Sequence, residues 1–235
     1  MYFKKLIKDI KDLKIQGAEN VAKASLLATQ SILKNSKAKT AHHLITELNY
    51  IKGLLFNSRP TEPCMHTTLN CLLTGLDHKS LERTKKQLKT NIKSVSKHFS
   101  LVEKKITEMG AKKIKRKSII FTHCHSSTVI NILLAAKKKH AFEVHNTETR
   151  PLYQGRITAE QLAKKGIKIT HYVDSAARYA LQKADLFLIG ADAITSEGDV
   201  VNKVGSGLFA EIAHKHKIPV YVCSNSWKFD TRTTQ

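Results

Sequence analysis

The stretch "IIFTHCHSSTV" (Ile119–Val129) places one thiol between two imidazoles and directly before three hydroxyl side chains. Cys124 lies where a predicted strand ends and a predicted helix begins. The free N–H groups and the dipole of a helix N-terminus stabilise a thiolate at such a position. A small, buried and unreactive cysteine fits the same pattern, because free cysteines are among the most buried residues. The sequence therefore leaves two interpretations of Cys124, a reactive thiol and a core residue.

The two histidines that flank this thiol are not expected to bind a metal ion. Alternate residues of a strand point to opposite faces, so the rings of His123 and His125 diverge. The chain has no further His or Cys at ligand spacing and no C-x-x-C pair. We expect these histidines to shape the surroundings of the thiol instead.

Three other features carry residues suited to chemistry or to anion binding. Asp192 ends the apolar run "LFLIGAD", where it is either a loop or helix cap or a shielded carboxylate with a raised pKa suited to proton transfer. The glycines of "GSGLFA" (Gly205–Ala210) indicate a tight turn at a helix N-terminus, where backbone N–H groups can bind a phosphate. Arg59 precedes a proline and is either a surface residue or an anion clamp.

These residues require elements that bring them together, and the second half of the chain provides the pattern. Five short apolar runs alternate with helical stretches: "SIIFTH", "AFEVHNTE", "IKITHYV", "DLFLIGAD" and "IPVYVCS". Ser126 or Ser127 is a candidate N-cap for one helix, and Thr158 for the next, which Gly166 ends. The alternation predicts a parallel, doubly wound α/β sheet. Ligands of such sheets bind beyond the carboxyl ends of the strands, where Cys124 and Asp192 both fall.

The first half of the chain has a helical pattern. Apolar residues recur at three- and four-residue spacing, with breaks at Gly17, at Asn35 and in "NSRPTEPC". The last helical segment, "SLERTKKQLKTNIKSVSKHFSLVEKKITEM", has few large apolar residues and is expected to cross the surface as a linker. The sequence thus predicts an N-terminal helical domain over residues 1–115, followed by a Rossmann-like α/β domain over residues 116–235.

Charge and hydropathy restrict the class of protein. The net charge is +21, and residues 1–117 hold 25 Lys and Arg against 9 Asp and Glu. Because nearly all these cations are Lys and few aromatic residues lie among them, a solvated surface is favoured over specific nucleic-acid binding. No apolar run is long enough to span a membrane, and the N-terminus lacks the apolar core of a signal peptide. We expect a cytoplasmic protein with no membrane contact.

Several motifs, in one order, resemble a single superfamily. They are "IQGAENVAKASL", "SRPTEP", "THCHSSTV", "ETRPLYQGRITAEQL", "VDSAARY", "GADAITSEGDVVNKVGS" and "SNSWKF". The superfamily contains the alpha, beta and delta subunits of translation initiation factor 2B, ribose-1,5-bisphosphate isomerase and methylthioribose-1-phosphate isomerase. The resemblance extends from about residue 14 to residue 229 and is nearest to the isomerase branch.

The resemblance implies an aldose–ketose isomerase that acts on a 1-phosphorylated ribose and gives a ribulose phosphate. The isomerases carry a catalytic Cys after the first strand and a catalytic Asp after "GA", which match Cys124 and Asp192. No cofactor is implied. The remaining matches imply substrate binding by Gln16, Gly17, Ala18, Glu19, Arg59, Ser126, Ser127, Thr128, Asn202, Lys203 and Lys228.

One departure leaves a second function open. Isomerases of a bisphosphate carry an Arg at the position of Gln16, so the substrate here is either a bisphosphate or a monophosphate. The alternative is a regulatory subunit of the initiation factor 2B type, which binds initiation factor 2 or a sister subunit, or senses a nucleotide or sugar phosphate. The expected partners are a phosphorylated pentose and further copies of the chain, in a dimer or a dimer-based hexamer.

Overall fold

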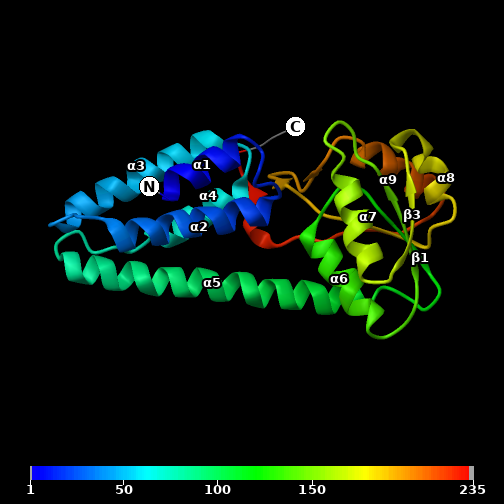
Figure 1. The fold of residues 1–235 in the computed structure, drawn as a ribbon, viewed down its shortest axis with the longest axis horizontal. Coiled ribbons are helices and arrows are strands. Elements are labelled where there is room, and N and C mark those ends of the chain that lie inside the picture. The colour runs from blue at the N-terminus through cyan, green and yellow to red at the C-terminus, as the bar shows by residue number, and fades with distance from the viewer. Residues whose placement is uncertain (1, 233–235) are drawn as a thin grey trace. The chain divides into compact units, whose positions relative to one another are not determined.

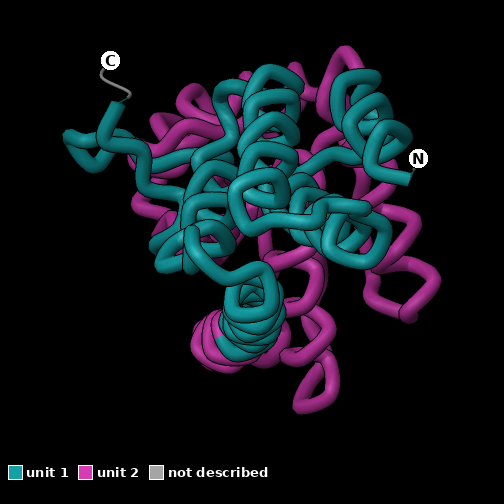
Figure 2. Tube along the Cα trace, turned by 90° about the vertical axis from the view of Figure 1, so that its left-hand side faces the viewer, with its two compact units in different colours: residues 1–101, 192–199, 226–235 teal, residues 102–191, 200–225 magenta. Residues whose placement is uncertain are grey.

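A computed structural model describes residues 2–232 of the chain, and Figure 1 shows their fold. Contacts between Cα atoms divide the chain into two compact units, drawn in different colours in Figure 2. Unit 1 comprises Met1–Leu101, Asp192–Asp199 and Ser226–Gln235, and unit 2 comprises Val102–Ala191 and Val200–Asn225. This division differs from the predicted boundary between residues 115 and 116. The first boundary between the units falls after Leu101, inside a helix, and two later segments of the chain belong to unit 1.

Unit 1 is built from helices with one apolar face each. Its helices are α1 (Tyr2–Lys11), α2 (Ala18–Asn35), α3 (Ala41–Ser58), α4 (Pro63–Leu73) and the first part of α5 (Leu81–Ala111). In α1 the spacing of three and four residues buries Phe3, Leu6 and Ile10 in the core of this unit. The predicted helical pattern and its breaks are therefore confirmed.

The long helix α5 was predicted, but its expected position on the surface is wrong for its first part. Leu88, Ile92 and Val95 recur at helical spacing and are buried in the core of unit 1. A narrow apolar stripe of this kind is enough to pack a helix, even where its mean hydropathy is low. Neither α5 nor any other described helix is long and apolar enough to cross a membrane.

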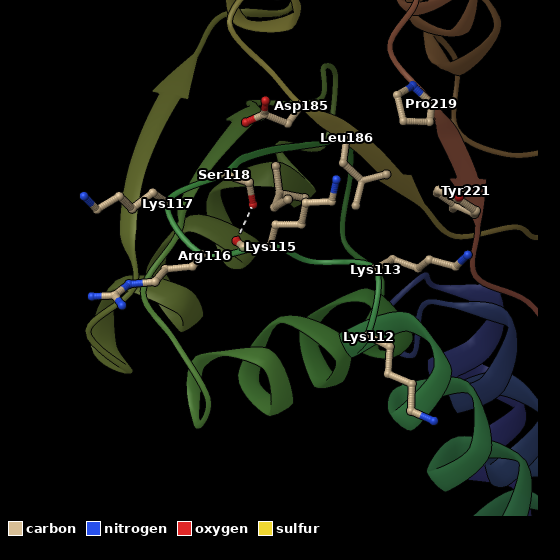
Figure 3. Close-up of a pocket in the computed structure, with 11 residues that line it drawn as sticks. Lys112, Lys113, Lys115, Arg116, Lys117, Ser118, Asp185, Leu186, Pro219 and Tyr221 are labelled. Carbon is tan, nitrogen blue, oxygen red and sulfur yellow. Dashed lines mark hydrogen bonds between the residues drawn. The ribbon is translucent and has the colours of Figure 1, made fainter.

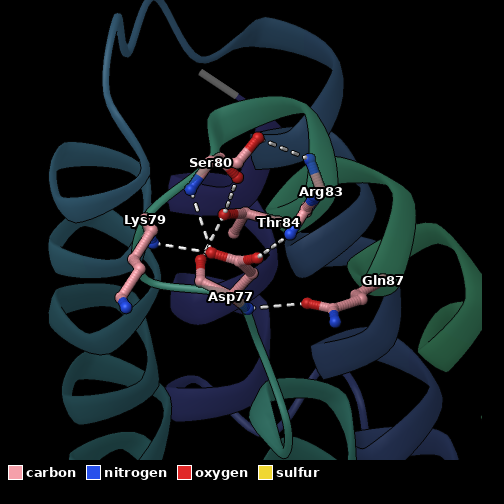
Figure 4. Close-up of polar contacts among 6 residues, drawn as sticks. All are labelled: Asp77, Lys79, Ser80, Arg83, Thr84 and Gln87. Carbon is pink, nitrogen blue, oxygen red and sulfur yellow. Dashed lines mark hydrogen bonds and ion pairs between the residues drawn. The ribbon is translucent and has the colours of Figure 1, made fainter.

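The turn before α5 is closed by Asp77 (Figure 4). Its carboxylate accepts the backbone N–H groups of Lys79 and Ser80 at 2.6 and 2.9 Å. Its own N–H donates to the side-chain oxygen of Gln87 at 2.6 Å. The hydrogen bonds from Ser80 and Lys79 hold the pKa of Asp77 below its usual value. These bonds fix the start of α5.

Unit 2 contains the predicted parallel sheet. Its strands are β1 (Ile119–Thr122), β2 (Glu143–Thr147), β3 (Lys168–Tyr172), β4 (Leu186–Ile189) and β7 (Val220–Val222), in the order β3-β2-β1-β4-β7. Every neighbouring pair is parallel, and Phe121 of β1 is in register with His145 on one side and Phe187 on the other. All five strands fall within the predicted runs, so the α/β fold class is confirmed.

Helices cover both faces of this sheet. Ile120 faces α6 (Ser127–Lys137) and α7 (Gln154–Lys164), whose apolar residues share its core cluster. The next residue, Phe121, faces α8 (Ala177–Leu181) and α9 (Ser206–Lys215) in a second cluster (Figure 1). Because alternate strand residues point to opposite faces, both faces must be apolar, and the sheet is doubly wound.

Several short elements were not predicted. In unit 1, β5 (Ala193–Thr195) pairs in parallel with β8 (Phe229–Asp230). The 3-10 helix η2 (Ser226–Lys228) is held in this unit because the ring of Trp227 stacks on His98 with centroids 3.8 Å apart. Unit 2 contains the 3-10 helix η1 (Asp174–Ala176) and β6 (Val200–Val201).

Candidate functional site

Cys124 lies in unit 2, in a short loop between β1 and α6. Its backbone has φ 67°, a left-handed conformation that is uncommon for a residue other than glycine. Its N–H donates to Oγ1 of Thr149 at 3.0 Å, and its carbonyl accepts from Oγ1 of Thr158 at 2.9 Å. The thiol-bearing residue is half-buried, and both of its backbone polar groups have partners. The surrounding structure therefore fixes this backbone in a strained conformation.

His123 is buried and both of its ring nitrogens are engaged. Nε2 lies 2.9 Å from the carbonyl of Val204, which can only accept, so Nε2 carries the proton. Nδ1 lies 2.6 Å from Oγ1 of Thr147 and accepts its hydroxyl hydrogen. Burial lowers the pKa of His123 and favours this neutral ring. The ring thus links the loop after β1 to the loop before α9.

His125 makes a separate contact. Thr158 donates its hydroxyl hydrogen to Cys124, so its oxygen accepts Nδ1–H of His125 at 3.1 Å. Burial lowers the pKa of this ring as well. Within residues 2–232 no group of three or more His, Cys, Asp or Glu is placed to hold a metal ion. The two histidines connect the thiol loop to different neighbours.

The turn after the thiol begins α6. Ser126 is the N-cap, and its side-chain oxygen accepts from the N–H of Val129 at 3.4 Å. Gly190, which follows β4, lies beside it, since a Cβ at Gly190 would be 2.8 Å from Oγ of Ser126. Of the two predicted caps, Ser126 is confirmed. Ser127 and Thr128 occupy the first turn of the helix.

Thr149 is the positioning residue that the sequence did not single out in this unit. It is fully buried, has φ 65°, and its hydroxyl accepts the N–H of Cys124. The carboxylate of Asp174 accepts the N–H groups of Thr149 and Arg150 at 2.8 and 2.7 Å. Loops after β2 and β3 therefore hold the thiol loop. The only signal in the sequence was the motif "ETRP" around this threonine.

The start of α7 corrects one prediction. Thr158 does not cap this helix, which begins four residues earlier at Gln154 with Tyr153 as its N-cap. The reason is a close approach at Gly155, where an added Cβ would lie 1.7 Å from the carbonyl oxygen of Thr147. Only glycine lets the helix start against β2 in this way. Thr158 then lies inside the helix and binds Cys124 and His125.

The turn before α9 is joined to the thiol loop through His123. Its N-cap is Gly205, with φ 97°, as the predicted tight turn requires. The amide of Asn202 donates to Oγ of Ser206 at 2.9 Å, and that hydroxyl donates to the carbonyl of Lys203 at 2.5 Å. The positive charge of Lys203 contributes to the lowered pKa of His123. Asn202 and Lys203 are thus near the thiol loop within unit 2.

The other predicted residues lie in unit 1, where a buried carboxyl group is central. Glu62 precedes α4, is 1% exposed, and forms a salt bridge of 2.5 Å with Arg59. Burial raises the pKa of Glu62 to about 7, although the guanidinium of Arg59 opposes this. Glu62 was not predicted from the sequence. Its signal was an acidic residue three positions after the candidate clamp Arg59.

Asp192 and Lys228 belong to the same surroundings within unit 1. The charge of Asp192 raises the pKa of Glu62, and the charge of Lys228 lowers it. Lys228 is 6% exposed, which is rare for a lysine, and it lies in η2. Asp192 is half-buried directly before β5. Two carboxyl groups and two cations therefore influence one another here.

The residues 16–19 form the start of α2. Gly17 is the N-cap, and Ala18 is buried in the first turn. The side chain of Gln16 donates to the carbonyl of Leu13 at 2.7 Å, while Glu19 pairs with Lys23 at 2.7 Å. Gln16 thus closes the turn that precedes α2.

Cys64, a cysteine of unit 1, has a different environment from Cys124 in unit 2. Cys64 is 0% exposed in α4, and burial raises the pKa of its thiol to about 12. A thiol with this pKa stays protonated near neutral pH and is a poor nucleophile. Cys64 is a core residue.

Taken residue by residue, the predicted set falls into two groups. Unit 2 brings together Cys124, Ser126, Ser127, Thr128, Asn202 and Lys203. Unit 1 holds Gln16, Gly17, Ala18, Glu19, Arg59, Asp192 and Lys228. Of the predicted catalytic residues, Cys124 thus lies in unit 2 and Asp192 in unit 1.

The chain is an α/β protein with a helical unit and a doubly wound parallel sheet. A loop that carries a thiol follows the central strand of this sheet. Residues 14–235 match the Initiation factor 2 subunit family. The chain belongs to this family, and the superfamily that its motifs resemble is confirmed.

Characterised relatives carry isomerase names. The chain is 35% identical to the ribose 1,5-bisphosphate isomerase of Pyrococcus furiosus, over 95% of this chain and 71% of that protein. It is 31% identical to the methylthioribose-1-phosphate isomerase of Pelotomaculum thermopropionicum, over 92% of this chain and 63% of that protein. These names agree with the predicted branch.

A solved structure has the same fold. The translation initiation factor eIF-2B of Pyrococcus horikoshii OT3 matches with a TM-score of 0.85 and 26% identity, over 97% of this chain and 79% of that chain. The prediction of a helical region followed by an α/β sheet agrees with this match.

Proposed function

We propose that this chain is an isomerase of a phosphorylated pentose, which converts a 1-phosphorylated ribose into a ribulose phosphate. The observation that carries the proposal is the loop of Cys124, a half-buried thiol whose backbone is held by Thr149 and Thr158. A sheet that only supported the fold would not need this strained and fully hydrogen-bonded residue. The names of the relatives support the same class of reaction.

The proposed reaction needs one acid and one base. Opening of the ribose ring adds a proton to the ring oxygen, and formation of the ketone removes the proton of the C2 hydroxyl. The hydrogen on C2 moves to C1, either as a proton through an enediolate or as a hydride. In both routes Cys124 and Asp192 serve as the pair that gives and takes the protons. Such groups each contribute roughly 10²–10⁴-fold to a rate.

Chain connectivity supports this pairing. Gly190 lies beside Ser126, which is two residues after the thiol. Asp192 follows two residues after Gly190, and two trans peptides span at most about 7–8 Å between Cα atoms. The Cα of Asp192 is therefore held within this distance of the Cα of Gly190.

The phosphate groups of the substrate are assigned to cations and to a helix start. In unit 2, Lys203 and the N-terminus of α6 at Ser126, Ser127 and Thr128 supply positive charge and N–H donors, with Asn202 beside them. In unit 1, Arg59 and Lys228 supply further cations.

We propose ribose 1,5-bisphosphate as the first substrate to test. Its isomerisation is followed by measuring ketose formation in parallel with 5-methylthioribose 1-phosphate and ribose 5-phosphate. The proposal expects turnover of the bisphosphate above either monophosphate. A preference for the 1-monophosphate would be explained by Gln16, because its side-chain amide carries no charge for a second phosphate and donates to the carbonyl of Leu13. A chain that converts none of the three would contradict the proposed function.

A second candidate function follows from the fold shared with the Pyrococcus horikoshii factor. In this alternative the chain is a regulatory subunit that binds initiation factor 2 or a sister subunit. Pull-down of purified initiation factor 2 at low ionic strength separates the alternatives, because charged surfaces bind most strongly there. Stable capture without sugar turnover would favour the regulatory subunit. Either function is proposed to use a homo-oligomer, which sedimentation would test.

A further inference from the structure

A basic pocket lies at the amino edge of the five-stranded sheet in unit 2, at the opposite ends of the strands from Cys124. It has a volume of about 550 Å³. One wall is the loop between α5 and β1, with the five cations Lys112, Lys113, Lys115, Arg116 and Lys117. The other wall comes from the starts of β4 and β7. The proposed isomerase reaction uses none of these residues.

The backbone of the basic loop is fixed. The hydroxyl of Ser118 donates to the carbonyl of Lys115 at 2.7 Å, and the N–H of Lys117 donates to the carbonyl of Ala141 at 2.8 Å. Ile114, between Lys113 and Lys115, is buried, and its carbonyl accepts from Nε2 of His140 at 2.9 Å. The cations therefore project from an ordered loop, which reduces the entropy that a bound anion must overcome.

The pocket has a strong excess of positive charge. Asp185 is the one carboxylate in its lining, and its Oδ2 accepts the N–H of Ile119 at 2.8 Å. Among the described residues, no carboxylate forms an ion pair with any of the five cations. Like charges held close together raise the free energy of the unbound loop and favour an anion.

The side chains divide into an inner pair and a rim. In Figure 3, Lys115 reaches over the pocket toward Leu186, and Lys113 lies toward Tyr221. Nζ of Lys113 is 5.0 Å from the centre of the Tyr221 ring, a cation–π distance that steadies this cation. Arg116 and Lys117 extend outward from the rim in the same view.

We infer that this pocket binds a compact polyphosphate, a small molecule with at least two phosphate groups close together. Its volume lies in the range of small-molecule sites. The inner pair of Lys113 and Lys115 lies over it and further cations stand at its rim, so a ligand with clustered phosphates forms more charge-assisted hydrogen bonds than one phosphate can.

The geometry favours a compact ligand over RNA. A nucleic-acid strand is bound along an extended track of cations, with several aromatic rings on which the bases stack. Here the cations come from a single loop of six residues, and Tyr221 is the one aromatic residue in the lining. The test must therefore distinguish binding of a compact polyphosphate from binding of RNA.

The test measures binding of inorganic tripolyphosphate to the whole chain by titration calorimetry at roughly physiological ionic strength. Inorganic phosphate and a poly-uridine oligonucleotide are the comparison ligands. The variant is the double substitution Lys113→Gln and Lys115→Gln. The matched control is Lys89→Gln with Lys93→Gln, two exposed lysines of α5 whose loss changes the net charge equally.

We expect one tripolyphosphate per chain, bound more tightly than phosphate. The pocket variant should bind at least about tenfold more weakly, as the loss of two charge-assisted contacts implies. The control variant should bind as the wild type does. Equal weakening in both variants would overturn the inference, because it would show attraction by net charge alone. Tighter binding of the oligonucleotide, or no preference over phosphate, would also overturn it.

Discussion

The two groups of predicted site residues are held in place by different forces. In unit 2, the direct partners of Cys124 are neutral, since its backbone binds the hydroxyls of Thr149 and Thr158. The ring of His123 likewise binds a backbone carbonyl and a hydroxyl, and the carboxylate of Asp174 acts one step further away by holding Thr149. Around Glu62 in unit 1, the polar groups are charged and buried. Neutral hydrogen bonds fix a geometry at little cost in desolvation, whereas buried charges depend on pH and on one another.

This difference indicates a division of roles. A reacting thiol needs a fixed backbone, and the Cys124 loop has one. Binding a phosphorylated substrate and moving protons need charge, which the surroundings of Arg59, Asp192 and Lys228 supply. The following changes should affect the two groups in different ways.

The largest effect is expected on the charged side. Asp192→Asn keeps the shape of the side chain but removes its capacity to accept a proton. We expect kcat to fall by roughly 10²–10⁴-fold, with little change in KM. Asp199→Asn, an exposed residue of the same unit, is the matched control and should turn over normally. Equal rates for the two variants would remove Asp192 from the reaction.

On the neutral side, the largest structural effect is expected at Gly155. In Gly155→Ala the new Cβ would lie 1.7 Å from the carbonyl oxygen of Thr147, so α7 must move away from β2. We expect the free energy of unfolding to fall by at least about 3 kcal/mol. Urea denaturation measures it. Gly207→Ala in α9 meets no atom within 4 Å and should leave stability equal or slightly higher.

The charged side should respond to pH. The carboxyl of Glu62 ionises near 4.5 in the unfolded chain and near 7 in the folded protein. Between these values the Glu62 carboxyl of the folded protein holds a proton that the unfolded chain has lost, so the contribution of Glu62 to stability falls as the pH rises through this window.

The buried histidines titrate in the same range with the opposite sign, so the effect of Glu62 is the difference between the wild type and Glu62→Gln. Between about pH 5 and about pH 8 we expect the wild type to lose about 2–3 kcal/mol relative to this variant. Urea denaturation at the two pH values checks this. Glu82→Gln, whose side chain is 88% exposed, is the control and should keep the wild-type dependence. The same pH dependence of stability in Glu62→Gln and in the wild type would contradict the assignment to Glu62.

The smallest effect should separate positioning from stability on the neutral side. Thr149→Val keeps the volume but leaves the N–H of Cys124 without its acceptor. We expect about 1–2 kcal/mol less stability and a lower kcat at unchanged KM. Thr149→Ser restores the hydroxyl and should restore kcat. If the serine variant stays as slow as the valine variant, the hydroxyl does not position the thiol.

The same comparison shows which features could be predicted from the sequence and which could not. The five strands, their parallel arrangement and a cap at Ser126 or Ser127 follow from local patterns of apolar and hydroxyl residues, so they were predicted. Glu62 and Thr149 were not selected, because their roles depend on neighbours that the fold brings from distant segments. Thr158 was assigned to a helix start, since nothing in the local pattern reports that Gly155 lets the helix begin earlier.

Cysteines show the same limit. Cys64 and Cys124 both precede apolar helical runs, and position alone does not tell a core thiol from a reactive one. Burial decides for Cys64, whose pKa is raised to about 12. For Cys124 the proposed reactive role is supported by its half-buried position and by the two threonines that hold its backbone.

The central claim is that Cys124 takes part in isomerisation, and its most direct test is the rate of ketose formation from ribose 1,5-bisphosphate by Cys124→Ser. Cys71→Ser, which replaces another half-buried thiol, is the matched control. We predict that Cys124→Ser loses at least roughly 10²-fold in kcat while it still binds the substrate, and that Cys71→Ser keeps the wild-type rate. Equal rates for Cys124→Ser and the wild type would contradict the account.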